Sequence, residues 1–141
     1  MVLNPEAGAR SARGLVVVTG ADGFAGRAAC ARFRAAGVPF RGLVRVLSAA
    51  TAAQPDMLAV GDLAGIADDA LANALRGAHA VVHLAGAVGK GPLVDVSLEE
   101  WRRLLEVNLT SAFLIARAAH ESLKASAGSL ISVSTSATGA T

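Results

Sequence analysis

Residues 15–26 read LVVVTGADGFAG, and this stretch decides the fold of the 141-residue chain. Val16, Val17 and Val18 form an apolar, β-branched run that is too short for a helix. The run predicts a strand buried on both faces, as in a parallel sheet. A glycine-rich turn follows, and a helical pattern begins directly after it. A helix that begins at such a turn offers amide groups and the positive end of its dipole to a phosphate.

Each glycine of the turn has a separate predicted task. Gly20 allows the tight turn, Gly23 lets the backbone approach a pyrophosphate, and Gly26 lets the new helix pack closely on the strand. The alternative is a strand-to-helix turn that binds no ligand, because a glycine-rich run alone is a weak signal.

Composition limits the class of protein. The chain is 53% hydrophobic and has one cysteine, Cys30, which excludes an internal disulfide and suits a reducing compartment. We expect Cys30 to be a small packing residue. Residues 1–13 lack the apolar core of a signal peptide and are expected to form a disordered leader before one domain over 14–141. No run is long enough to span a membrane, so we expect a cytoplasmic protein.

The charge pattern does not favour a nucleic-acid partner. The net charge is +2, the arginines of the N-terminal half are scattered, and aromatic residues make up 4% of the chain. A nucleic-acid surface would need clustered cations or a known motif. No histidine or cysteine cluster has the spacing of metal ligands, so we expect no metal.

Periodicity places the remaining elements. Helical spacing predicts a helix over 24–36 whose inner face holds Ala25, Ala28, Ala29, Phe33 and Ala36. Residues 48–55 read as a loop. Further strands are expected at 38–46, 57–60, 80–84 and 130–133, with helices at 68–76 and 97–125. Alternating strands and helices predict a doubly wound parallel α/β sheet of five strands in the order 3-2-1-4-5, with helices on both faces.

The helix over 97–125 carries two further signals. Ser97 and Glu100 have the spacing of a capping box. The helix is apolar on most of its sides, and the sheet can cover only one of them. We therefore expect a partner surface on the other side.

Five separate stretches meet at the carboxyl edge of the predicted sheet, where doubly wound folds bind ligands. They are 20–26, Arg45, Asp62, 85–87 and 134–136. An acid after the second strand would bond the ribose hydroxyls of NAD, whereas an arginine accommodates the additional phosphate of NADP. Arg45 therefore favours NADP over NAD, unless it is only a solvated arginine at a strand end.

The sequence from Leu15 onward resembles the short-chain dehydrogenase/reductase superfamily. The stretch 19–26 is similar to its TGxxGxxG cofactor loop, and Asp62-Leu63 to its Asp-hydrophobe pair beside the adenine. His83-Leu84-Ala85-Gly86 resembles the turn beside the adenine ribose, and Asn108 the asparagine that supports a proton relay. The resemblance implies a Rossmann domain that binds NADP or NAD. It also implies a homodimer formed through the helix over 97–125, which commonly forms a dimer interface in the family. The implied cofactor-binding residues are Gly20, Asp22, Gly23, Phe24, Gly26, Arg45, Asp62, Leu63, Ala85, Gly86 and Ala87.

The two ends of the chain resemble different branches of the superfamily. TGADGFAG and VVHLAG are similar to the extended branch of nucleotide-sugar epimerases and dehydratases, whereas residues 97–113 resemble the single-domain reductases. The first match implies Ser136 as the active hydroxyl and the second implies Thr135. Ser136 is slightly favoured, and a merely polar loop is the remaining alternative.

The resemblance also implies a catalytic tyrosine and a lysine downstream of it, which this sequence lacks. There is no tyrosine, and Lys90 and Lys124 both precede the serine segment. We therefore expect the cofactor-binding portion of an NAD(P)-dependent oxidoreductase or nucleotide-sugar epimerase/dehydratase, without its substrate-binding part and inactive by itself. The alternatives are an NAD(P)-sensing or dimerising module without catalysis, and a truncation that folds poorly.

Overall fold

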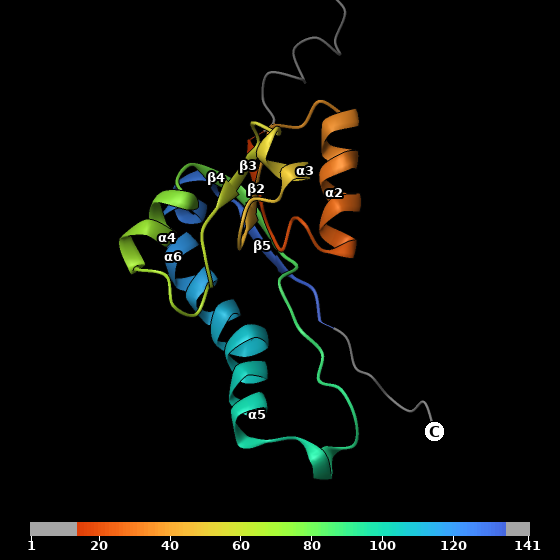
Figure 1. Ribbon diagram of the computed structural model, residues 1–141. Helices are drawn as coiled ribbons and strands as arrows, with labels where there is room; N and C mark the ends of the chain where they lie inside the picture. The colour runs from red at the N-terminus through yellow and green to blue at the C-terminus, as the bar shows by residue number, and fades with distance from the viewer. Residues whose placement is uncertain (1–13, 135–141) are drawn as a thin grey trace, which may run out of the picture.

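A computed structural model of the chain describes residues 14–134 (Figure 1). Five parallel strands form one sheet in the order β3-β2-β1-β4-β5. This arrangement confirms the predicted doubly wound α/β fold and its strand order. The strands are β1 (Leu15–Thr19), β2 (Phe40–Val44), β3 (Met57–Ala59), β4 (Ala78–His83) and β5 (Ser129–Ser132).

Helices cover both faces of the sheet, as predicted. One face carries α2 (Phe24–Ala35), which packs on β1 and β2. The other face carries α4 (Asp68–Ala74) and α6 (Ser111–Ser126), which pack on each other, with α6 against β4 (Figure 1). The shorter elements are α3 (Ala49–Ala52), a 3-10 turn (Leu93–Asp95), α5 (Leu98–Leu105) and a π-helical turn (Glu106–Thr110).

The sheet is buried on both faces at its centre because its side chains alternate. Val17 belongs to the core beneath α4 and α6, and Val18 to the core beneath α2. Both are fully buried. The apolar run around β1 is thus the buried parallel strand that the sequence predicted.

The inward face of α2 differs from the prediction. Gly26 and Cys30 are the buried residues of this helix. Of the predicted inner face, Phe33 packs half-buried on the core and Ala29 is half-buried, whereas Ala25, Ala28 and Ala36 are exposed. The turn before α2 sets this rotation, because a Cβ on Gly26 would lie 2.0 Å from the Gly20 carbonyl oxygen. The helix therefore presents its glycine to the turn, and Cys30 follows one turn later as a packing residue.

Two local predictions are corrected. The predicted loop at 48–55 contains α3, because Ser48 and Thr51 form a reciprocal capping box. Ser97 caps α5 by accepting from the Glu100 amide, but the Glu100 carboxylate pairs with Arg103 instead of returning to the cap. The capping box predicted at residue 97 is therefore only half formed.

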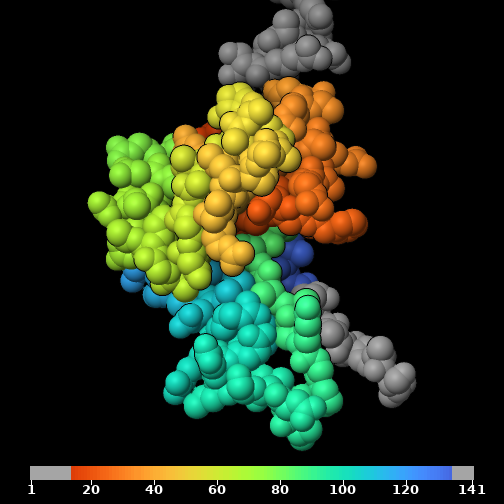
Figure 2. All heavy atoms as spheres, viewed as in Figure 1, coloured from red at the N-terminus to blue at the C-terminus, as the bar shows by residue number. Residues whose placement is uncertain are grey.

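The predicted helix over 97–125 is interrupted. It runs as α5, the π-helical turn and α6, and the Ser111 amide bonds back five residues to the Glu106 carbonyl. Figure 2 shows α5 and the loop before it extending from the body of the molecule. Within residues 14–134, no helix has the length and apolar character needed to cross a bilayer. The predicted leader 1–13 lies outside the described residues.

Candidate functional site

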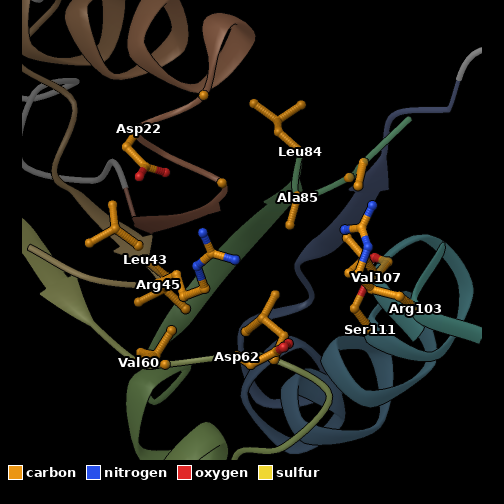
Figure 3. A pocket seen from close by; sticks show the side chains of 17 residues that line it. Asp22, Leu43, Arg45, Val60, Asp62, Leu84, Ala85, Arg103, Val107 and Ser111 are labelled. Atoms are coloured by element: carbon orange, nitrogen blue, oxygen red, sulfur yellow. Dashed lines mark hydrogen bonds between the residues drawn. The ribbon is translucent and has the colours of Figure 1, made fainter. Parts of the chain in front are cut away.

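A cavity of about 400 Å³ opens at the carboxyl edge of the sheet, where the strand order reverses between β1 and β4 (Figure 3). Most of the predicted binding residues line it. They are Gly20, Asp22, Gly23, Arg45, Asp62, Leu63, Ala85, Gly86 and Ala87. The turn after β1 and the segments after β2, β3 and β4 thus meet in one place, as the topology predicted.

Gly20 is required both by backbone conformation and by space. Its φ is +63°, which is in the left-handed region. A Cβ there would lie 2.8 Å from the Ala85 amide nitrogen and 2.9 Å from its Cα. Gly20 therefore lets the turn after β1 lie directly against the segment after β4.

Two predicted binding residues do not line the cavity. Phe24 is the first residue of α2 and its side chain is 91% exposed. Gly26 is buried under the turn, so its contribution is the close packing of α2 rather than a cavity wall. Phe24 was predicted as a binding residue only from its position in the glycine-rich motif.

A buried chain of hydrogen bonds underlies the cavity. Thr19 Oγ1 accepts from the amides of Leu84 and Ala85, at 3.2 and 3.3 Å. Both its lone pairs are then used, so its proton goes to His83 Nδ1, 2.7 Å away. His83 therefore carries its hydrogen on Nε2 and donates it to Ser111 Oγ at 3.2 Å. Burial lowers the pKa of His83, which also favours this neutral form.

Asn108 holds the segment after β4 from the other side. Its Oδ1 accepts from the Ala87 amide at 2.9 Å, and its Nδ2 donates to the Ala87 carbonyl at 2.8 Å. The side chain thus pairs with both polar groups of one peptide residue. Asn108 lies in the π-helical turn, so this irregular turn is tied directly to a wall of the cavity.

Two acidic and two basic side chains line the cavity. Asp22, Arg45 and Asp62 come from the segments after β1, β2 and β3, and Arg103 from α5 (Figure 3). Asp62 Oδ1 also accepts from the Ala64 amide at 3.2 Å, which fixes its loop. Arg103 is paired with Glu100 through two contacts of 2.7 Å.

Sequence reasoning missed a group of lining residues. Four-residue spacing along the helix marks Arg103, Val107 and Ser111, but nothing in the sequence states which helix face meets the cavity. The others are Leu43, Val44 and Val60, which neighbour predicted residues in the sequence, and Gly61 and Leu84, which lie within the motifs of the family resemblance but were given no binding role. The predicted hydroxyls of Thr135 and Ser136 lie outside the described residues.

Comparison with known proteins agrees with this geometry. The profile of the family described as enoyl-(acyl carrier protein) reductase matches residues 34–141. The chain belongs to the short-chain dehydrogenase/reductase superfamily. A 3-alpha-(or 20-beta)-hydroxysteroid dehydrogenase of Mycobacterium tuberculosis is 42% identical to this superfamily member over 67 residues, covering 47% of this chain and 26% of the relative.

Solved members of the superfamily share the fold. The ligand-free aldohexose dehydrogenase of Thermoplasma acidophilum superposes with a TM-score of 0.72 at 25% identity, covering 86% of this chain and 49% of that one. A short-chain dehydrogenase/reductase of Agrobacterium tumefaciens with bound NAD gives 0.62 at 27% identity, covering 77% and 30%. Each match thus spans less than half of the relative's own length.

The described part of the chain offers no metal centre. Among residues 14–134, no group of three or more histidine, cysteine, aspartate or glutamate side chains could hold a metal ion.

Proposed function

We propose that this chain is the cofactor-binding portion of an NAD(P)-dependent oxidoreductase. The carrying observation is the contact of Gly20 with Ala85, which brings the turn before α2 and the segment after β4 together around one cavity. A Cβ on Gly23 would approach only the Gly20 carbonyl oxygen, so the side of Gly23 toward the cavity has room for a ligand. The family relative with bound NAD supports the same cofactor class.

The walls fit the parts of a dinucleotide. Gly20, Gly23 and the N-terminus of α2 suit the diphosphate, because amides and the helix dipole favour an anion there. Asp62 and Leu63 suit the adenine, and Ala85 to Ala87 its ribose. Within the described residues Arg45 has no carboxylate partner, so its charge is available for the phosphate of NADP, which we propose as the preferred cofactor.

The bound nicotinamide would supply hydride exchange with an alcohol or carbonyl group. We assign Ser136, or Thr135, to polarise the substrate oxygen, and Asn108 to support the proton relay by fixing the π-helical turn against Ala87. A secondary alcohol is the favoured substrate class, because the mycobacterial relative is a hydroxysteroid dehydrogenase. The epimerase/dehydratase alternative rests on the turn sequences TGADGFAG and VVHLAG.

Binding and turnover are tested separately. Titration of the chain with NADP and NAD, followed by calorimetry and by amide shifts in NMR, should show saturable binding with the largest shifts at Gly20, Gly23 and Gly86. No amide shift at these glycines would contradict the proposal. Because the chain has no tyrosine, we expect no hydride transfer from NADPH to a panel of ketones.

A dimer is the second part of the proposal. Trp101, Leu105, Leu109 and Phe113 are spaced by four residues along α5, the π-helical turn and α6, and all are exposed. An exposed apolar stripe of this kind marks a protein interface. The same observation supports the alternative of a dinucleotide-sensing module that acts through association.

A further inference from the structure

Arg103 is a charged wall of the cavity to which the sequence gives no role. It lies on α5, and Val107 and Ser111 continue the same wall at four-residue spacing. Arg45 and Asp62 come from the other side, in the segments after β2 and β3 (Figure 3). The adenosine end proposed above therefore lies between the strand ends and the helix that carries Arg103.

The guanidinium of Arg103 is held in one orientation. Its Nε and Nη2 donate to the two carboxylate oxygens of Glu100, each at 2.7 Å. The Glu100 backbone amide is fixed in turn by Ser97 Oγ at 3.1 Å. The bidentate pair occupies one edge of the planar group and leaves its flat faces available. The mutual hydrogen bonds lower the pKa of Glu100 and raise the pKa of Arg103, so both groups stay charged.

The salt bridge between Arg103 and Glu100 determines which part of a dinucleotide Arg103 can bind. A phosphate placed on this guanidinium would also approach the Glu100 carboxylate, whose oxygens are 2.7 Å from the same nitrogens. Arg45 forms no salt bridge among residues 14–134, so its guanidinium is not already occupied by a carboxylate and it is the better phosphate ligand. A neutral, flat aromatic ring suits the face of a guanidinium that is already paired.

We propose that Arg103 is an adenine-binding residue, whose guanidinium, anchored by Glu100, lies flat against the adenine ring of the bound dinucleotide. This inference rests on the proposed function, since it needs a dinucleotide in the cavity. Val107 completes the same wall with an apolar surface. The pair Glu100–Arg103 thereby gives the cofactor a contact that is independent of the phosphate carried by NADP.

The test compares variants of the full 141-residue chain by calorimetry with NADP, NAD, AMP and nicotinamide mononucleotide. Arg103→Met should weaken NADP, NAD and AMP by a similar factor of about 3- to 10-fold, and leave the mononucleotide unchanged. Arg103→Lys should restore only part of the loss, because it returns the charge without the planar face. Arg102→Met, on the same helix but outside the cavity lining, is the matched control and should bind like the parent chain.

The variant Glu100→Gln distinguishes stacking of Arg103 on the adenine from a contact of Arg103 with a phosphate. The variant removes the anion beside Arg103, so a phosphate contact would become stronger and NADP would bind more tightly. Stacking predicts a modest loss for NADP, NAD and AMP alike, because the carboxamide can accept only one of the two bonds that hold the guanidinium. A loss confined to NADP in Arg103→Met, or unchanged binding of all four ligands, would overturn the assignment. If the parent chain binds no dinucleotide, the proposed function itself fails, which is a different result.

Discussion

His83 stands between two hydroxyl groups, and the direction of each hydrogen bond is fixed by its neighbours. Thr19 donates to Nδ1 because its acceptor positions are taken by the amides of Leu84 and Ala85. If Nδ1 carried a proton, the His83 ring and the Thr19 hydroxyl would both be donors at this contact, and the hydrogen bond between them would be lost. The neutral ring therefore keeps the turn after β1 joined to the segment after β4, and protonation is expected to disrupt that junction.

The first prediction concerns stability and pH. The folded chain holds the pKa of His83 below its ordinary value through burial, so the unfolded chain takes up the proton first as pH falls. This contribution to stability is complete above about pH 6.5 and is lost as pH falls below it. Urea unfolding between pH 7.5 and 5.5 should show a slope of at most about 1.4 kcal/mol per pH unit from this group.

The control for this prediction is the exposed His79. His83→Gln lowers overall stability but should remove the slope, whereas His79→Gln should keep it. An unchanged slope in His83→Gln would show that another group titrates in this range.

Asp22 and Arg45 provide the second prediction. The Ala21 amide bonds the Leu43 carbonyl at 3.2 Å, which places the turn after β1 beside the end of β2. Both charged side chains line the cavity there (Figure 3). The carboxylate opposes a phosphate that the arginine would attract. Asp22→Asn should tighten NADP binding by about 3-fold and Arg45→Met should weaken it by about 10-fold.

NAD is the internal control for both Asp22 and Arg45. Its dissociation constant should change much less than that of NADP, since it lacks the additional phosphate. Equal changes for the two cofactors in calorimetry would place the phosphate elsewhere.

At the scale of single elements, the π-helical turn links the long helix to the cavity. One turn of an α-helix holds 3.6 residues, so residues four apart do not lie directly above one another. Side chains repeated every four residues therefore shift gradually around the helix axis. The π-helical turn holds more residues per turn and reduces this drift. Arg103, Val107 and Ser111 can therefore all line the cavity. Sequence periodicity marks the four-residue spacing, but it does not state which face of the helix meets the cavity, which is why this wall could not be predicted.

Asn108 carries the third prediction. Asn108→Ala removes both bonds to Ala87, so residues 85–87 should exchange their amide hydrogens faster. The free energy of unfolding should fall by only about 1 kcal/mol, because water can replace these exposed bonds. Dinucleotide binding should weaken several-fold. Hydrogen exchange measures the opening of residues 85–87, and calorimetry on the same sample measures the dissociation constant. Thr110→Ala, in the same turn but outside the cavity lining, should change neither.

At the scale of the whole molecule, the sequence predicted the topology because a parallel sheet needs apolar strands and crossover helices, and both leave periodic signals. Strand-end logic likewise placed Arg45 and Asp62 at one cavity. The predicted inner face of α2 was right for Phe33 but wrong for Ala25, Ala28 and Ala36, because the rotation of the helix depends on the contact of Gly26 with the Gly20 carbonyl. Contacts between distant segments, such as His83 with Ser111, leave no local pattern.

The exposed stripe on α5 and α6 carries the last prediction. Trp101, Leu105, Leu109 and Phe113 expose 48%, 39%, 66% and 60% of their surfaces. A second copy of the stripe would cover these residues, so the chain should sediment as a dimer at micromolar concentration. Leu109→Glu would bury a carboxylate without a partner and should raise the dissociation constant more than about 100-fold. Val94→Glu is the control, since Val94 is 91% exposed but lies outside the stripe, and this variant should remain a dimer. A parent chain that sediments as a monomer at tens of micromolar would show that the stripe is covered in another way.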